Sequence, residues 1–255
     1  MISKKITFKN SDGIFLSAKL ELPENEPKAF AIFAHCFTCN KNLTAVRTIG
    51  RTLTEKNIAV LRFDFTGLGE SEGDFENTNF SSNIEDLHSA AQFLEINYKA
   101  PSLLIGHSLG GAAVLYASSN MPSIKAIATI GAPACPSHVS HIFKNSIEEI
   151  TASGKAIVSI GGRPFTIKKQ FMEDIKSKNI HKSLEKFRDS LLILHSPQDT
   201  VVGIDNAAEI YTTARHPKSF VSLNGADHLL SDKKDSKYVG NIIATWADRY
   251  IEAKL

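Results

Sequence analysis

The stretch of sequence that decides the fold is Leu103-Leu104-Ile105-Gly106-His107-Ser108-Leu109-Gly110-Gly111-Ala112-Ala113-Val114. An apolar run leads into Gly106, and a run of small residues leaves from Gly110. Between them stands Gly-x-Ser-x-Gly, the pattern of a nucleophile elbow, in which a strand turns sharply into a helix and exposes the serine hydroxyl. The glycines remove Cβ atoms that would clash in so tight a turn. The stretch therefore predicts that Ser108 is a nucleophile. The alternative is a glycine-punctuated strand–helix connection of some other α/β protein.

The segments on either side of this stretch predict a mostly parallel sheet. A continuous apolar run, typical of a strand buried on both faces, occupies residues 29–35. Further buried strands are expected at 58–65 and 124–130, and strands also at 191–195 and 219–223. Segments with helical spacing lie between or after them, at residues 42–56, 82–98, 207–214 and 239–252. Residues 6–8 and 14–20 flank a turn and predict a starting hairpin. We expect an α/β fold with helices on both faces of the sheet.

Residues 134–189 interrupt this alternation of strands and helices. They contain two segments with helical patterns, 137–153 and 168–187, on either side of an expected hairpin at 156–160 and 164–167. The strand pattern then resumes. We therefore expect one domain over residues 1–255, with a cap inserted at about 134–189.

A serine nucleophile needs a base, and the base needs an acid to orient it. In α/β-hydrolases these residues follow one another in the order Ser, Asp or Glu, His. Asp199 and His228 have this order, and with Ser108 each follows the end of an expected strand. Ligands of such sheets bind at the carboxyl ends of the strands, so the three should meet on one rim. Asp205 is the weaker alternative for the acid.

The oxyanion of an acyl-transfer reaction needs two backbone N–H donors. One should be Leu109, directly after the nucleophile, and the other Phe37, in the loop after the strand at 29–35. That loop also contains Cys36 and Cys39. No second Cys/His pair is spaced to complete a zinc site, and no thioredoxin-like pattern surrounds the two cysteines. We therefore expect two ordinary thiols and no metal.

A second glycine-rich segment, residues 66–73, follows the strand at 58–65. Its glycines do not fit the dinucleotide-binding pattern, and no Gly-Lys-Ser/Thr follows them. We therefore expect a tight structural loop there.

Composition excludes several classes of protein. The 255 residues carry a net charge of only +2 with both signs mixed, so nucleic acid is not an expected partner. The longest apolar stretch is interrupted by glycines, His107 and Ser108, so we expect no membrane span. The start of the chain has no apolar signal segment, and three cysteines make no disulfide framework. A reduced, cytoplasmic protein is the simplest expectation. The oligomeric state is left open.

The residues also resemble a known family, the α/β-hydrolases, over essentially the whole chain. The matching segments are residues 35–37, 62–71, 106–111, 199 and 227–228. Residues 35–39, 162–165 and 226–230 resemble, more narrowly, the hydrolase half of bacterial fusions with an osmotically inducible protein C (OsmC) peroxidase domain. Cys36 departs from the usual His-Gly dipeptide of the family. The resemblance implies serine esterase-like activity without a metal or organic cofactor.

These features predict a serine hydrolase that forms an acyl-enzyme with a small ester or thioester. An amidase or peptidase of the same fold is the nearest alternative. A hydrolase-fold receptor for a small molecule, with little turnover, is an alternative of another class, and a redox protein using Cys36 and Cys39 is a third.

Overall fold

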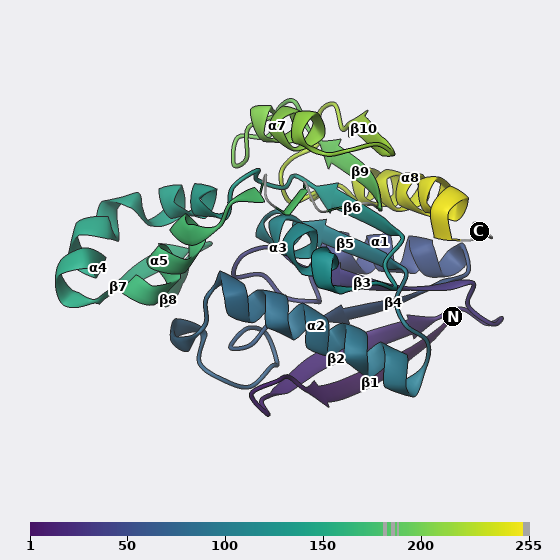
Figure 1. Cartoon of the computed structure of the whole chain (residues 1–255), viewed down its shortest axis with the longest axis horizontal. Coiled ribbons are helices and arrows are strands. Elements are labelled where there is room, and N and C mark those ends of the chain that lie inside the picture. Colours follow the sequence, from purple (N-terminus) through teal and green to yellow (C-terminus); the bar gives the residue numbers. More distant parts are fainter. Residues whose placement is uncertain (181–182, 185–186, 188, 252–255) are drawn as a thin grey trace.

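The centre of the computed structural model is an eight-stranded sheet in the order β1-β2-β4-β3-β5-β6-β9-β10 (Figure 1). The structure describes residues 1–180, 183–184, 187 and 189–251. The strands are β1 (Ile2–Lys9), β2 (Phe15–Leu22), β3 (Ala29–Ala34), β4 (Ile58–Phe63), β5 (Leu103–His107), β6 (Ala126–Ile130), β9 (Ser190–His195) and β10 (Lys218–Ser222). From β4 to β10 neighbouring strands are parallel, whereas β1 and β2 form an antiparallel hairpin that pairs with β4.

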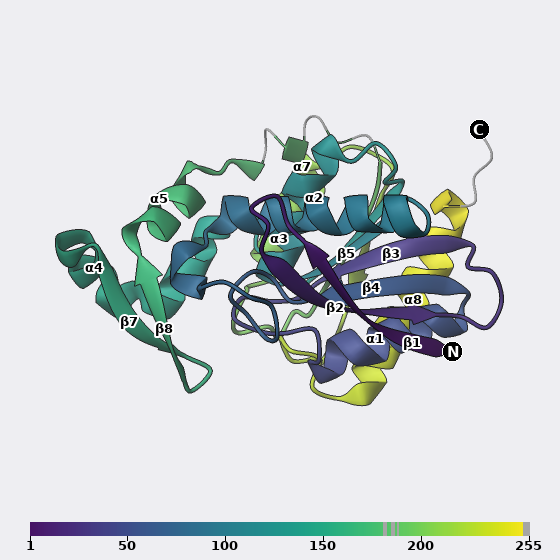
Figure 2. The ribbon, with the colours of Figure 1, turned by 90° about the horizontal axis from the view of Figure 1, so that it is seen from below.

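Helices cover both faces of this sheet (Figure 2). One face carries α1 (Thr44–Glu55) and α8 (Lys233–Ile251), and the other carries α2 (Phe80–Asn97), α3 (Leu109–Ala117) and α7 (Asp205–Thr213). Every residue of β3, β4, β5, β6 and β9 is buried between these layers. Burial between two layers of helices explains why these strands are so apolar in the sequence. The expected α/β architecture is confirmed.

Residues 136–177, between β6 and β9, leave the sheet and lie at one end of the molecule (Figure 1). We call this segment the cap. It contains the 3₁₀ stretch η3 (Pro136–Ser146), α4 (Ile147–Ser153), the antiparallel strands β7 (Lys155–Ile160) and β8 (Arg163–Lys168), and α5 (Lys169–Ser177). The β7–β8 hairpin lies where the sequence predicts one, at 156–160 and 164–167.

Two expected cap helices are different in the structure. The segment expected to be helical at 137–153 is helical in two pieces: a 3₁₀ stretch with non-helical backbone angles at the buried Phe143 comes first, and α4 follows it. Spacing of apolar residues does not distinguish the two kinds of helix over so short a stretch. The helix expected over 168–187 is interrupted: α5 ends at Ser177, Lys178 is extended, and the described residues 180, 183 and 184 are helical again. Residues 181–182, 185–186 and 188 lie outside the described part.

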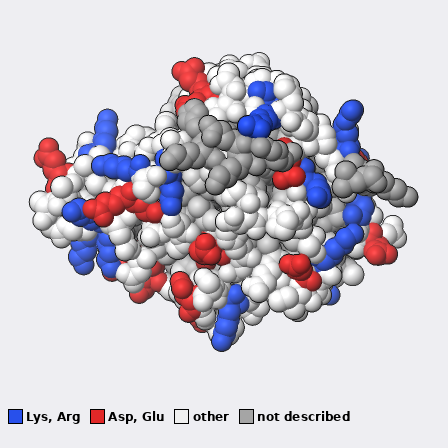
Figure 3. Space-filling model, in the orientation of Figure 1, with Lys and Arg blue, Asp and Glu red and all other residues white. Residues whose placement is uncertain are grey.

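Charges of both signs are interspersed on the face of the molecule that Figure 3 displays. Within the described residues, no helix combines the length and the apolar character that crossing a membrane requires.

Candidate active site

Ser108 occupies the sharp turn between β5 and α3. Its backbone angles are φ 54° and ψ −125°, a conformation that a residue with a side chain rarely adopts. The turn brings the chain so close to itself that a Cβ atom on Gly106 would lie 2.3 Å from the Gly110 carbonyl oxygen. A Cβ atom on Gly110 would lie 2.4 Å from the carbonyl oxygen of His35, at the end of β3. The glycines thus permit both the turn and the close approach of the loop after β3.

The structure brings Ser108, His228 and Asp199 together in one chain of hydrogen bonds. His228 lies between β10 and α8, and its Nε2 is 3.0 Å from the Ser108 Oγ. Its Nδ1 is 2.7 Å from Oδ2 of Asp199, which follows β9. All three residues follow the carboxyl ends of parallel strands. In this arrangement Nε2 can accept the serine proton while the carboxylate fixes Nδ1–H.

The Asp199 carboxylate is held by its own loop as well as by His228. Its Oδ1 accepts hydrogen bonds from the backbone N–H groups of Val201 (2.8 Å) and Val202 (2.9 Å). Burial alone would raise the pKa of Asp199, but the hydrogen bonds from His228 and from the two amides together lower it. The carboxyl is therefore ionised at neutral pH. Asp205, the weaker candidate, is the first residue of α7.

Two buried histidines support this arrangement, and sequence reasoning missed their positions in it. His107 Nε2 lies 2.7 Å from the backbone carbonyl of His228, and His195 Nε2 lies 2.7 Å from that of Val202. Because a carbonyl only accepts, each Nε2 donates. His107 therefore fixes the backbone of His228, and His195 fixes the loop that holds Asp199. The one signal in the sequence is that His107 adjoins Ser108 and His195 ends a strand.

Burial sets the protonation of both supporting histidines. It lowers the pKa of His107 to about 4, helped by the nearby charge of His228. Burial also lowers the pKa of His195, against the opposing effects of Val202 and Asp199. In both rings Nδ1 is buried and has no hydrogen-bond partner. Both side chains are therefore neutral at physiological pH.

The expectation of free thiols at Cys36 and Cys39 is wrong. The structure joins them in a disulfide that closes a four-residue turn, in which the Cys39 N–H donates to the Cys36 carbonyl at 3.1 Å. The turn brings their Cα atoms to 5.2 Å, within the usual range for a disulfide. The spacing alone did not reveal this fold-back. Cys135 is free. The bond also removes the free-thiol argument for a reduced, cytoplasmic protein, which stays a prediction.

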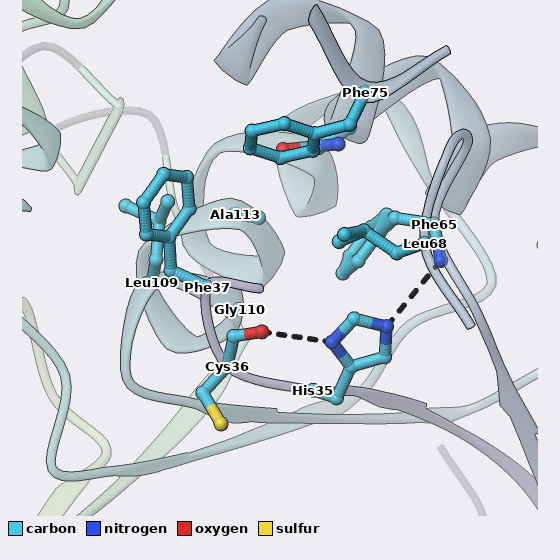
Figure 4. Close-up of a pocket in the computed structure, with 10 residues that line it drawn as sticks. His35, Cys36, Phe37, Phe65, Leu68, Phe75, Leu109, Gly110 and Ala113 are labelled. Atoms are coloured by element: carbon cyan, nitrogen blue, oxygen red, sulfur yellow. Dashed lines mark hydrogen bonds between the residues drawn. The ribbon is translucent and has the colours of Figure 1, made fainter. Parts of the chain in front are cut away.

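Phe37, the expected second oxyanion donor, lies inside this disulfide-closed turn. Phe37 lines the same pocket as Leu109 and Gly110, which stand at the start of α3 (Figure 4). The pocket is otherwise mainly apolar, with Phe65, Leu68, Phe75 and Ala113 among its lining residues. Phe37 and Leu109, which are expected to supply the two donors, thus line one pocket.

Hydrogen bonds hold the base of this loop. His35 Nδ1 donates to the Cys36 carbonyl at 2.8 Å, and its Nε2 accepts from the Phe65 N–H at 3.4 Å (Figure 4). Burial lowers the pKa of His35, which keeps the ring neutral in this role. Further along, Lys41 is buried and its Nζ lies 2.5 Å from Oδ2 of the equally buried Asp64.

Aromatic side chains of the cap pack against the loop. The Phe37 ring lies 5.4 Å from Phe171 of α5 and 5.7 Å from Phe75, which in turn lies 5.0 Å from Phe165 of β8. Arg163 of β8 also donates to the Thr38 carbonyl. The cap is therefore attached to the loop that carries Phe37.

No metal site emerges from the described side chains: no three His, Cys, Asp or Glu residues among them are grouped so that they could hold an ion.

The mostly parallel sheet with the Ser108 turn at the end of β5 is the α/β-hydrolase fold. Residues 25–162 match the family described as "Serine aminopeptidase, S33" (Hydrolase_4), more than half of the chain, and the chain belongs to that family.

Comparisons with individual proteins agree with this fold. An esterase domain from Rhodothermus marinus is 50% identical, with a TM-score of 0.81, over 98% of this chain and all of that one. An uncharacterised protein of Salmonella typhimurium, YfhR, is 25% identical over 89% of this chain and 75% of its own. The rat monoglyceride lipase is 27% identical over 45% of this chain and 38% of its own. The chain is thus an esterase- and lipase-like α/β-hydrolase. The narrower resemblance to OsmC fusions stays a prediction.

Proposed function

We propose that the protein is a serine esterase that hydrolyses small esters through an acyl-enzyme. The observation that carries the proposal is the unbroken chain of hydrogen bonds from Ser108 Oγ through His228 to Asp199, at 3.0 and 2.7 Å. The identity of 50% with an esterase domain over nearly the whole chain favours ester substrates.

In the proposed reaction the Ser108 Oγ attacks the ester carbonyl while His228 Nε2 takes its proton. The charge that develops on the carbonyl oxygen is stabilised by the backbone N–H groups of Phe37 and Leu109. His228 then gives the proton to the leaving alcohol, and Asp199 stabilises the imidazolium between these steps. Water, activated by His228, hydrolyses the acyl-enzyme. These steps use no metal or organic cofactor.

We further propose that residues 1–255 are one domain whose cap, about 134–189, limits the size of the acyl group. Three cap residues support this role. Phe171 packs on Phe37 and Phe165 packs on Phe75, and both of these partners line the pocket. Phe143 packs on Phe171 in turn. Short acyl groups should therefore be preferred.

The test compares Ser108→Ala with Ser119→Ala, a matched change at an exposed serine beyond α3. Ser108→Ala should lower kcat on p-nitrophenyl acetate and butyrate by at least about 10³-fold. It should also abolish labelling by a fluorophosphonate. Ser119→Ala should match the wild type. Turnover of Ser108→Ala at the wild-type rate would refute the proposal.

An amidase or peptidase is the second candidate, because the matched family is described as a serine aminopeptidase. Values of kcat/KM for an ester, a thioester and an aminoacyl anilide distinguish an esterase from a thioesterase and a peptidase. A larger kcat/KM for the anilide would favour the peptidase. Stoichiometric labelling with negligible turnover of the whole panel would instead favour a receptor.

A further inference from the structure

The disulfide lies within the loop that carries the proposed oxyanion donor. Cys36 and Cys39 close a turn whose two central residues are Phe37 and Thr38. Thr38 is buried and has φ 58°, a left-handed conformation that a threonine adopts only when its surroundings hold it there. The orientation of the Phe37 amide therefore depends on restraints that keep this turn closed.

Both flanks of the turn are fixed independently of the disulfide. On one side the His35 ring holds the Cys36 carbonyl, and on the other Lys41 is held by Asp64. The base of the loop consequently stays in place when the sulfur–sulfur bond opens. The disulfide therefore restrains only the turn between Cys36 and Cys39. Closing so short a loop contributes little to the stability of the whole fold.

The sulfur atoms are not placed to react with a substrate. In Figure 4 the Cys36 side chain points away from the pocket, whereas its carbonyl points to His35. Nor does the pair begin a helix, since α1 starts only at Thr44. A helix N-terminus is what usually activates a Cys-x-x-Cys pair for dithiol chemistry. The arrangement fits a restraint on the backbone better than a redox catalyst.

We propose that the Cys36–Cys39 disulfide positions the Phe37 N–H, and that a dithiol reductant that opens it lowers turnover reversibly. This inference rests on the proposed esterase function. Cys36 and Cys39 are positioning residues here, which act through the backbone of Phe37.

The exchange balances with a dithiol as the reductant. Cys39 is partly exposed whereas Cys36 is buried, so the first thiolate attacks the Cys39 sulfur and releases Cys36 as a thiolate, which takes up a proton. The second thiolate then attacks the reductant's own sulfur in the mixed disulfide and releases Cys39. The protein gains two thiols, and the reductant leaves as a cyclic disulfide after giving up two electrons.

The first experiment uses the wild-type protein. Oxidised and dithiothreitol-reduced samples are desalted under argon, because thiols themselves cleave p-nitrophenyl esters, and kcat and KM are measured. Reduction should lower kcat at least about tenfold and change KM less than about threefold, since a displaced oxyanion donor weakens transition-state binding. Fluorophosphonate labelling should slow in parallel. Reoxidation with glutathione disulfide should restore both rates, and circular dichroism should show an unchanged fold.

Variants assign the effect to this disulfide. Cys36→Ser/Cys39→Ser should have the low kcat of the reduced protein with or without reductant. Cys135→Ser, which removes the free cysteine, should keep the wild-type kcat and its reversible loss.

Equal kcat and labelling rates before and after reduction would overturn the inference, as would wild-type kcat in the double variant. Such a result leaves the esterase proposal intact. If the oxidised wild type neither turned over esters nor labelled at Ser108, the esterase proposal and the inference would both fail.

Discussion

At the scale of single residues, His107 combines a tight hydrogen bond with an unusual ionisation. Its Nε2 donates to the His228 carbonyl at 2.7 Å, while its Nδ1 is buried without a partner. Protonation would place an unpaired N–H in this site, which is the physical reason that burial lowers the pKa of His107 to about 4. The residue next to the proposed nucleophile is thus neutral at physiological pH.

His107 should make the protein less stable as the pH falls. Between pH 6.5 and pH 4 the unfolded chain binds a proton at this residue and the folded chain does not, so the free energy of unfolding falls as the pH is lowered. From pH 7.5 to pH 4.5 this residue should account for a loss of about 2 to 3 kcal/mol. Glutamine keeps an N–H donor but does not titrate. In urea unfolding, the free energy of unfolding of His107→Gln should therefore fall by about 2 to 3 kcal/mol less than that of the wild type between pH 7.5 and pH 4.5.

The exposed His216 provides the control for this measurement. His216→Gln makes the same substitution at an exposed site and controls for the change of residue type. All other titrating groups are common to the proteins and cancel in the comparison. If the free energy of unfolding of His107→Gln depended on pH as strongly as that of the wild type, His107 would not resist protonation in the folded protein.

The proposed nucleophile, base and acid could be selected as a set from the sequence because each follows a recognisable strand. Ser108 has a local pattern, and the order of Asp199 and His228 along the chain limits the choice. The supporting contacts could not be predicted in this way. The bond from His107 to His228 joins residues 121 positions apart and leaves no local pattern. The disulfide at Cys36 depends on a fold-back of the backbone that the spacing does not encode.

At the scale of elements, a network of charges centred on the buried Lys41 and Asp64 holds the loop between β3 and α1. Lys41 Nζ contacts Asp64 Oδ2 at 2.5 Å and Glu70 Oε2 at 2.8 Å. The Lys41 N–H also donates to Asp64 Oδ1 at 2.6 Å, and its carbonyl accepts from Arg62. Gly69 belongs to the same network, because a Cβ there would lie 2.2 Å from Asp64 Oδ2. The glycine-rich segment at 66–73 is therefore a structural loop packed around Asp64.

Removing the Lys41 charge should destabilise the protein strongly. Lys41→Met leaves the buried Asp64 without its cationic partner, which should lower the free energy of unfolding by about 3 to 5 kcal/mol. Urea unfolding at pH 7 measures the change. Lys56→Met, at an exposed lysine after α1, is the matched control and should change stability by less than about 0.5 kcal/mol. Similar stabilities of the two variants would contradict a supporting role for the Lys41–Asp64 pair.

Most strands of the sheet could be predicted, because a central strand that is buried on both faces consists mainly of apolar residues. Their bounds shifted by a few residues: the run at 58–65 contains β4, which ends at Phe63. The cap was less predictable. Its elements pack on only part of their surface, so the spacing of apolar residues determines neither the 3₁₀ geometry of η3 nor the end of α5 at Ser177.

At the scale of the whole molecule, the cap contacts the rest of the chain at several places, among them the loop after β3 and the start of α2, besides Phe75–Asn77, where Lys168 pairs with Glu76. Arg163 and Phe171 contact the first of these. At the second, Asp174 of α5 accepts from the backbone N–H and the hydroxyl of Ser81, both at 2.7 Å. A carboxylate there satisfies a free N–H of the first turn of α2 and interacts favourably with the helix dipole.

Loss of the Asp174 carboxylate should loosen the cap and leave the sheet unchanged. Asp174→Ala removes two hydrogen bonds to Ser81 and the ion pair with Lys178 at 3.0 Å. Local opening of α5 and the β7–β8 hairpin should become easier by about 2 kcal/mol, which corresponds to roughly 30-fold faster amide exchange in residues 155–177. Exchange in β3, β5 and β6 should not change. Hydrogen–deuterium exchange with mass spectrometry measures both regions at once.

Glu173 offers a matched control on the same helix, because its carboxylate is exposed and pairs with Lys169 at 3.5 Å. Glu173→Ala should change cap exchange by less than about twofold, since an exposed pair of this kind contributes little. If Asp174→Ala accelerated exchange in the sheet as much as in the cap, the two parts would unfold as one cooperative unit. The cap could then not open on its own. Faster exchange confined to the cap would instead show that the Asp174–Ser81 contact holds the cap against the rest of the chain.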